Sequence, residues 1–158
     1  MNEFILQSTL NEQDFIKAFN KNNVEYMLVG GLSVFVHGYG RTTGDMDIWV
    51  NKTAPNYLKI QLAFRDFGMP LFDMTIDNFL GDKNDVYSFG REPQKIDVMT
   101  AVKGLSFEEA YPNSIRAKLE DTELVVIGVD DLIKAKSAVS RTKDKLDIEM
   151  LKKLFNKK

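Results

Sequence analysis

The stretch Val29 to Val50, VGGLSVFVHGYGRTTGDMDIWV, decides how this chain is interpreted. It joins a Gly-Gly pair to two aspartates, Asp45 and Asp47, that are separated by one residue. If residues 45 to 50 form a strand, side chains alternate between its two faces, so both carboxylates point the same way with their Cα atoms roughly 6.5–7 Å apart. Two anions on one face resist burial unless a cation accompanies them. The pattern therefore predicts a metal site.

The available ligands restrict which metal could bind there. Oxygen-only ligands favour a hard ion such as Mg²⁺ or Mn²⁺. The chain has no cysteine and one histidine, which excludes disulfides and thiolate zinc sites and leaves too few nitrogen ligands for a conventional zinc centre. Upstream, Gly30 and Gly31 allow close backbone approach to a ligand, and a following helix N-terminus would present free N–H groups to phosphate. These features together predict a site for a metal and a nucleotide.

Length and composition indicate one globular domain. The 158 residues are 44% hydrophobic and 28% charged, so we expect a single domain over residues 1–158 with a helical part from about residue 130. The longest weakly polar run, Tyr26 to Val36, is shorter than the roughly 18–20 residues of a membrane span. The N-terminus has no basic segment of the kind that begins a secretion signal, so we expect no membrane association and a cytoplasmic protein. A net charge of −2 gives no global attraction for nucleic acid, although residues 134–158 are locally basic.

Hydrophobic periodicity and turn residues predict a mixed order of helices and strands. The expected helices cover residues 11–22, 32–36, 54–67, 131–139 and 143–155, with short helical turns near 79–80 and 107–111. The expected strands cover residues 26–29, 47–50, 86–89, 95–99 and 123–127, and GREPQ forms a hairpin connection.

Three details of this assignment depend on individual residues. In the helix over 54–67 we expect Leu58, Leu62 and Phe67 to lie on one side, with Gly68 ending the helix. Asp130 is the expected cap of the helix that follows. In the last helix we expect an inward face, formed by Leu146, Met150, Leu151 and Leu154.

A third carboxylate completes the candidate site. Asp97 lies within the apolar strand KIDVMT, where an aspartate is costly unless it is paired or liganded. A strand beside residues 45–50 could bring Asp97 next to Asp45 and Asp47. Phosphoryl transfer generally needs such a third carboxylate, because one ion orients the attacking oxygen and another orients the triphosphate.

On these motifs the chain resembles the minimal nucleotidyltransferase-like proteins of the polymerase β superfamily. Val29-Gly30-Gly31, a gap over residues 32–44, and Asp45-Met46-Asp47-Ile48 resemble the family signature, and Asp97 matches its later carboxylate. The segments GGLSVFVHGYGRTTGDMDIWV and VIGVDDLIKAKSAVSRTKDKLDIEML are similar to the toxin–antitoxin subgroup. Taken singly these motifs are common, but in this order they are moderately specific.

The resemblance implies a fold, ligands and residue roles. The fold would be an α+β arrangement with a small mixed sheet, flanking helices and C-terminal helices. Asp45, Asp47 and Asp97 would bind two divalent metals and catalyse the reaction. Ser33 and the Gly30-Gly31 backbone would hold the phosphates of an NTP such as ATP.

Each of these residues also has a purely structural interpretation. Asp45 and Asp47 could be surface residues of an edge strand, and Gly30-Gly31 could serve only a turn. Asp97 could form a salt bridge with Lys95 or Arg91. Ser33 could be a helix N-terminal cap.

Further polar residues also have both a functional and a structural interpretation. Arg41, in the loop before the aspartates, could contact phosphate, whereas a structural role is favoured for His37. The basic residues Lys136, Arg141 and Lys143 fit a solvated helix face, although they could reach the nucleotide or an RNA substrate. Asp144 and Asp147 fit surface partners for those lysines.

The sequence therefore predicts a nucleotidyltransferase that moves NMP from an NTP to a hydroxyl acceptor and releases pyrophosphate. The acceptor could be a tRNA 3′ end, a protein side chain or a small molecule, and the toxin-like resemblance points to tRNA or a partner protein, such as an antitoxin or a HEPN-type protein. The alternative is a non-catalytic nucleotide-binding module or antitoxin. The sequence leaves the oligomeric state undefined.

Overall fold

The protein is described by a computed structural model that covers residues 12–30, 33, 37, 46–91, 94–138 and 142–154. Its helices are α2 (Glu12–Lys21), α4 (Ala54–Phe67), α5 (Ile76–Leu80), α6 (Phe107–Ala110), the 3₁₀ turn η1 (Tyr111–Asn113), α7 (Val129–Ser137) and α8 (Thr142–Leu154). Its strands are β1 (Tyr26–Val29), β2 (Met46–Val50), β3 (Val86–Arg91), β4 (Gln94–Met99), β5 (Ile115–Leu119) and β6 (Thr122–Val126). None of the described helices is long and apolar enough to cross a membrane.

The strands form one six-stranded mixed sheet in the order β3-β4-β2-β1-β6-β5. β2 pairs in parallel with β4, and β1 pairs in parallel with β6, whereas β1–β2, β3–β4 and β5–β6 are antiparallel. This sheet with its flanking helices confirms the predicted α+β class. The hairpin between β3 and β4 and the strands at residues 26–29 and 47–50 are confirmed as well, within a residue or two at their ends.

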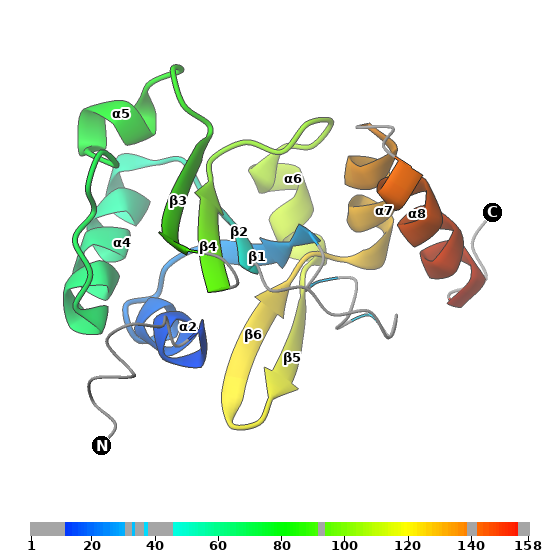
Figure 1. Cartoon of the computed structure of the whole chain (residues 1–158), viewed down its shortest axis with the longest axis horizontal. Helices are drawn as coiled ribbons and strands as arrows, with labels where there is room; N and C mark the ends of the chain where they lie inside the picture. The colour runs from blue at the N-terminus through cyan, green and yellow to red at the C-terminus, as the bar shows by residue number, and fades with distance from the viewer. Residues whose placement is uncertain are drawn as a thin grey trace.

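One face of the sheet carries the main hydrophobic core. Met46, Ile48 and Val50 alternate along β2 and are all buried on this face. Helices α2 and α4 cover it, since the Phe19 ring lies 5.7 Å from Tyr26 of β1 and the Phe64 ring lies 4.9 Å from Phe89 of β3. In Figure 1, α2, α4 and α5 accordingly gather on one side of the molecule.

The opposite face of β2 carries Asp47 and Trp49. The Phe107 ring of α6 packs edge-on against Trp49 at a centroid distance of 5.3 Å, which places α6 over this second face. Figure 1 shows α6, α7 and α8 grouped away from α2 and α4. Different helices therefore cover the two faces of the sheet, and α6 covers the face that carries Asp47.

Helix α4 confirms the bounds predicted for it but corrects its inner face. The Thr53 hydroxyl accepts from the Asn56 N–H, 3.2 Å away, and Gly68 ends the helix with φ 88°. Of the residues expected on one side, Leu58 and Leu62 are exposed, whereas Phe67 is partly buried against the core. The buried face consists of Asn56, Tyr57, Ile60, Ala63 and Phe64. The Tyr57 hydroxyl on this face donates a hydrogen bond to Met74 O. A polar contact therefore helps to hold α4 in place.

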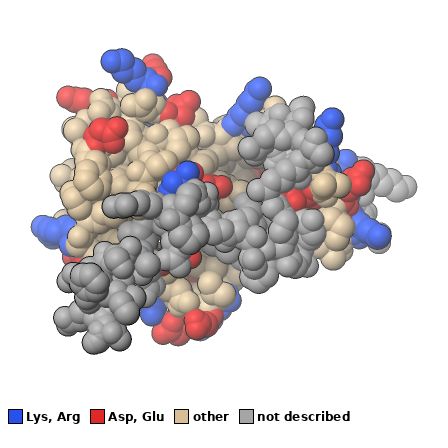
Figure 2. Space-filling view, viewed as in Figure 1, with Lys and Arg blue, Asp and Glu red and all other residues tan. Residues whose placement is uncertain are grey.

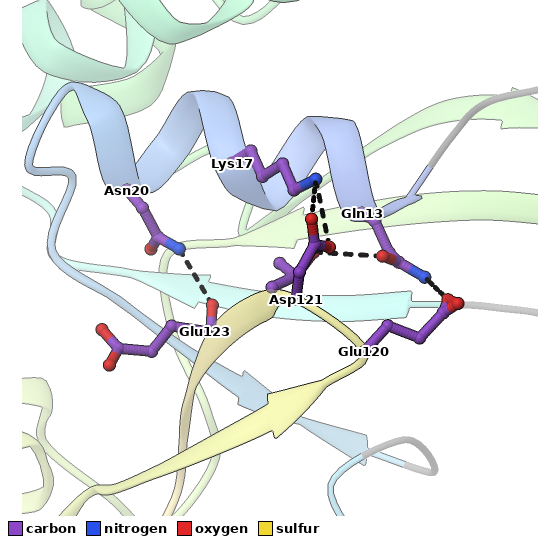
Figure 3. A network of polar contacts seen from close by, with 7 residues as sticks. Gln13, Lys17, Asn20, Glu120, Asp121 and Glu123 are labelled. Atoms are coloured by element: carbon purple, nitrogen blue, oxygen red, sulfur yellow. Dashed lines mark hydrogen bonds and ion pairs between the residues drawn. The ribbon is translucent and has the colours of Figure 1, made fainter.

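Strand β5 was absent from the sequence prediction, and it forms an edge of the sheet. The turn between β5 and β6 is held against α2 by the polar contacts in Figure 3. Gln13 donates to Glu120 at 2.8 Å, and Lys17 lies 3.2 Å from Asp121. Asn20 donates to the Glu123 backbone carbonyl at 2.9 Å. Exposed side chains therefore hold the β5–β6 hairpin against α2.

The two C-terminal helices differ from the prediction in their polar and apolar faces. Gly128, rather than Asp130, is the residue before the first turn of α7. In α8, Leu151 is buried as expected, but Leu146 and Leu154 are exposed. The predicted inward face of the last helix is therefore only partly correct.

A buried ion pair joins α7 and α8. Lys136 Nζ lies 3.0 Å from Asp147 Oδ2, and the two side chains are only 8% and 1% exposed. The predictions of a solvated Lys136 and a surface Asp147 are therefore wrong, although the two residues do pair. Asp144 and Lys143 have no described side chains, and Arg141 lies outside the described residues.

Candidate functional site

The sheet brings two of the predicted site residues together. In the parallel register of β2 and β4, Asp47 is directly beside Asp97. Val29 of β1 is the partner of Asp47 on the other side, and Ser88 of β3 is the partner of Asp97. Residues paired across neighbouring strands project from the same face, so the two carboxylates share the face that α6 also covers. The predicted proximity of Asp97 to Asp47 is confirmed.

Two side chains contact Asp97, one from the neighbouring strand β3 and one from its own strand β4. The Ser88 hydroxyl donates to Asp97 Oδ1 at 2.6 Å, and Lys95 Nζ lies 3.9 Å from Asp97 Oδ2. The salt bridge to Lys95 considered in the sequence is thus present, but a separation near 4 Å with partly exposed partners contributes little stability. The Asp97 side chain keeps 18% of its surface exposed, so it remains accessible to a ligand.

Ser88 is a polar neighbour that the sequence interpretation did not identify. The β3–β4 hairpin could have identified it. Counting residue pairs outward from the turn, starting with Arg91 and Gln94, places Ser88 opposite Asp97. The hydrogen bond fixes the orientation of the carboxylate.

Gly30 allows the backbone to pass close to Asp47. It follows β1 with φ 70°, in the left-handed region that favours glycine. A Cβ atom at this position would collide with Asp47 Oδ2 and would lie 3.0 Å from Asp47 Cγ. A glycine is therefore needed here both for its φ angle and for the space that the carboxylate occupies.

We expect Gly30→Ala to lower the free energy of unfolding by about 2–4 kcal/mol, because the new methyl group must displace the Asp47 carboxylate and adopt a disfavoured φ. Gly68→Ala is a matched control, since Gly68 also has a positive φ but has nothing within 4 Å of an added Cβ. Urea unfolding of both variants measures the difference. Equal losses in the two variants would contradict the close approach of Gly30 to Asp47.

Ser33 lies in the helical turn that follows Gly30. Its side chain is fully buried, and its hydroxyl donates to Gly30 O at 2.6 Å. An N-terminal cap accepts from backbone N–H groups, so this contact is not that of a cap. The His37 N–H donates to Ser33 O, and His37 Nε2 lies 2.8 Å from Ile127 O, which agrees with a structural role for the histidine. Phosphate binding by Ser33 stays a prediction.

The donor set around Asp47 suits a hard cation. Two carboxylates in register on adjacent strands offer oxygen ligands. Within the described ranges no group of three or more carboxylate, histidine or cysteine side chains is gathered as a metal site. Asp45, Gly31 and Arg41 lie outside the described residues, so their predicted roles rest on the sequence alone.

The chain is similar to known proteins in its fold. No family model and no curated protein sequence matches the chain. Among solved structures, the lincosamide antibiotic adenylyltransferase LnuA, in its lincomycin-bound crystal structure, matches with a TM-score of 0.58 and 17% identity over 93% of this chain and 99% of that chain. A candidate nucleotidyltransferase from Thermotoga maritima, TM1012, matches with a TM-score of 0.53 and 12% identity over 92% of this chain and 90% of that chain.

These similarities show that the chain has a nucleotidyltransferase fold. Identities of 12% and 17% do not carry over an activity, because one fold can support different functions. The predicted fold is therefore confirmed, and the chemistry must be argued from the residues of the site.

Proposed function

We propose that this protein is a metal-dependent nucleotidyltransferase, which moves NMP from an NTP to a hydroxyl acceptor and releases pyrophosphate. The observation that carries the proposal is the in-register pair Asp47 and Asp97 beside Gly30, in a sheet with this fold. Two adjacent carboxylates on one face of the sheet supply the oxygen ligands that a hard divalent cation prefers.

The proposed roles are those that the resemblance to the nucleotidyltransferase-like family implies. Asp45, Asp47 and Asp97 would hold Mg²⁺ or Mn²⁺, and Asp97 would also accept the proton of the acceptor hydroxyl. Gly30, Gly31, Ser33 and Arg41 would bind the phosphates. When bound, the divalent ions would neutralise charge on the triphosphate and lower the pKa of the acceptor hydroxyl. The side chains of the protein mainly position the reacting groups.

Several acceptors are compatible with this reaction. Lincomycin is bound in the structure of LnuA, so a small-molecule acceptor is one candidate for this chain. A tRNA 3′ end or a protein side chain, within a toxin–antitoxin pair, is the other. On the face shown in Figure 2, acidic and basic side chains of the described residues are interspersed, which offers little attraction for a long polyanion. The balance therefore favours a small acceptor.

We expect Mg²⁺ together with an NTP to raise the melting temperature of the wild type, by about 5–10 °C when the NTP exceeds its Kd a hundredfold. EDTA should abolish this increase. Asp47→Asn should also abolish it, because one of the two carboxylates proposed to bind the ion is removed. Thermal melts test this, and equal stabilisation of the wild type and Asp47→Asn would contradict the proposed metal site.

A further inference from the structure

Strand β3 forms an edge of the sheet, and its backbone groups alternate between β4 and the outside. Figure 1 shows β3 outside β4, at one end of the strand order. The Thr100 N–H donates to Asp85 O, so this pair of the ladder is hydrogen-bonded. In an antiparallel ladder, every second residue counted from Asp85 then points its N–H and C=O groups toward β4. Val86, Ser88 and Gly90 therefore point their backbone groups outward.

The outer side of β3 is open to another strand. Among the described residues, none hydrogen-bonds to the outward backbone groups of β3. Residues 86–90, VYSFG, carry no charge, whereas β5 at the other edge carries Arg116 and Lys118. Charged side chains, lysine above all, discourage pairing at a sheet edge, and an unpaired edge without them is a template for a further strand. The β5 edge is therefore protected against pairing, and the β3 edge is not.

A second copy of β3 can satisfy all of these outward groups. In an antiparallel pair centred on Ser88, this residue opposes Ser88 of the second copy, and Val86 opposes Gly90. Each outward residue thus meets another outward residue. A two-fold axis generates this pairing, because both copies use the same patch. Gly90 has φ 84°, which bends the end of the strand, so the Ser88 pair is the regular centre and the Val86–Gly90 pairs are its outer ends.

The side chains are complementary in the same register. Asp85 precedes β3 and Arg91 ends it, so opposite charges face each other at both ends of the pair. Between them Tyr87 opposes Phe89, and such aromatic pairs stabilise neighbouring strands. A shift by two residues would instead place Lys83 opposite Arg91, where like charges repel. The charge pattern therefore favours a second copy of this chain, paired in the register centred on Ser88.

Phe72 adds apolar surface at the same edge. Its ring centroid lies 6.3 Å from that of Phe89, and the residue is 68% exposed. Phe72 also has φ 52°, a left-handed conformation that is rare for a bulky residue and costs free energy. Within one copy the exposed ring gains little burial in return. Because Phe89 lies opposite Tyr87 of the second copy, pairing would cover part of the Phe72 ring.

We propose that this protein forms a symmetric dimer in which β3 of one copy pairs with β3 of the other, antiparallel and centred on Ser88. The two six-stranded sheets would then form one continuous sheet. The two-fold axis is perpendicular to this sheet, so both copies present Asp97 on the same face. Asp97 lies one strand inward from Ser88, which separates the two carboxylates by three strand spacings, or roughly 14–15 Å. Formation of the dimer does not depend on the proposed function.

Sedimentation velocity tests association, over protein concentrations from about 1 μM to 1 mM. We expect the mass of the wild type to rise from that of a monomer toward that of a dimer, with a Kd of about 1–100 μM, because an edge pair with few apolar side chains is a small interface. Asp85→Arg and Arg91→Asp each place like charges opposite one another, and each should weaken the dimer at least about tenfold. Lys118→Asp, a charge change on the β5 edge, should leave association unchanged.

An equimolar mixture of Asp85→Arg and Arg91→Asp tests the register itself. In the mixed dimer opposite charges meet again at both ends, so the mixture should associate about as strongly as the wild type. Melting temperatures at about 1 μM, where the protein is expected to be monomeric, establish that each variant is folded. If Arg91→Asp fails to fold, Val86→Lys charges the same edge at a residue that is 49% exposed, and it should weaken the dimer equally.

Three results would overturn the inference. The first is a wild type that stays monomeric at every concentration, which would leave the β3 edge unpaired or reserved for a different chain. The second is a dimer that Asp85→Arg and Val86→Lys do not weaken, since the contact would then lie elsewhere. The third is a mixture of Asp85→Arg and Arg91→Asp that associates no better than either variant alone.

Discussion

Asp97→Asn is expected to reduce nucleotidyl transfer by at least about two orders of magnitude while NTP binding persists. The substitution keeps the shape of the side chain, and an asparagine oxygen can still accept the hydrogen bond from Ser88, so the fold should be preserved. It removes the negative charge and the ability to take a proton, which together are worth about 10²–10⁴ in rate at a positioned acid–base group. Label transfer from NTP and calorimetric NTP binding, on the same preparation, measure the two effects separately.

Asp77→Asn provides a matched control for this substitution, since Asp77 lies exposed in the first turn of α5, away from β2 and β4. It should retain full transfer. A transfer rate within a few-fold of wild type in Asp97→Asn would show that Asp97 is only a partner of Ser88 and Lys95. Loss of NTP binding together with transfer would instead indicate that Asp97 serves nucleotide binding as a whole.

The second large effect is expected on stability. Asp147→Ala should lower the free energy of unfolding by about 3–5 kcal/mol, because it leaves the Lys136 ammonium buried without this counter-ion. Replacing both partners with apolar residues, Lys136→Met with Asp147→Leu, should recover most of that loss. Urea unfolding of the single and double variants measures both values.

The Lys17–Asp121 pair is the control for this prediction. It has a similar separation of 3.2 Å, but its side chains are 45% and 77% exposed. Asp121→Ala should therefore lower the stability much less than Asp147→Ala does. If Asp147→Ala and Asp121→Ala lose the same stability, burial does not set the energy of the Lys136–Asp147 pair.

The sequence predicted the centre of the sheet because its signals there are local. Alternation along residues 46–50 separates the apolar face from the aspartates, and the apolar run of β1 ends at Gly30. The hairpin before Asp97 then brings its strand into the same sheet. The pairing of Asp47 with Asp97 follows from these short-range patterns together with the resemblance to a known family.

Strand β5 was missed although its sequence alternates apolar and basic residues, which is the pattern of a strand. As an edge strand it is largely exposed, so little of it contributes to the core. The turn that follows it uses Glu120 with φ 56° where glycine or asparagine is usual. The turn chemistry therefore gave no sign of a hairpin.

The incorrect predictions of helix faces have a different cause. Which face of a helix is buried depends on contacts between residues that are distant in the sequence. Helical spacing allows several inner faces for α4, and the sheet selects the one with Tyr57 and Phe64 rather than Leu58. Lys136 and Asp147 resemble surface residues until α7 and α8 pack together. Likewise, only the folded chain shows that Trp49 Nε1 and Thr100 Oγ1 are buried without a hydrogen-bond partner among the described residues.

The most direct measurement is nucleotidyl transfer by the wild-type protein. NTP labelled in its α-phosphate is incubated with the protein and Mg²⁺, in the presence of small hydroxylated compounds, total tRNA or cell lysate, and both pyrophosphate release and labelled product are recorded. The proposal predicts one labelled acceptor, equal amounts of product and pyrophosphate, and loss of both in EDTA and in Asp97→Asn. Mg²⁺-dependent NTP binding with no labelled acceptor under any of these conditions would contradict catalysis and leave a nucleotide-binding module.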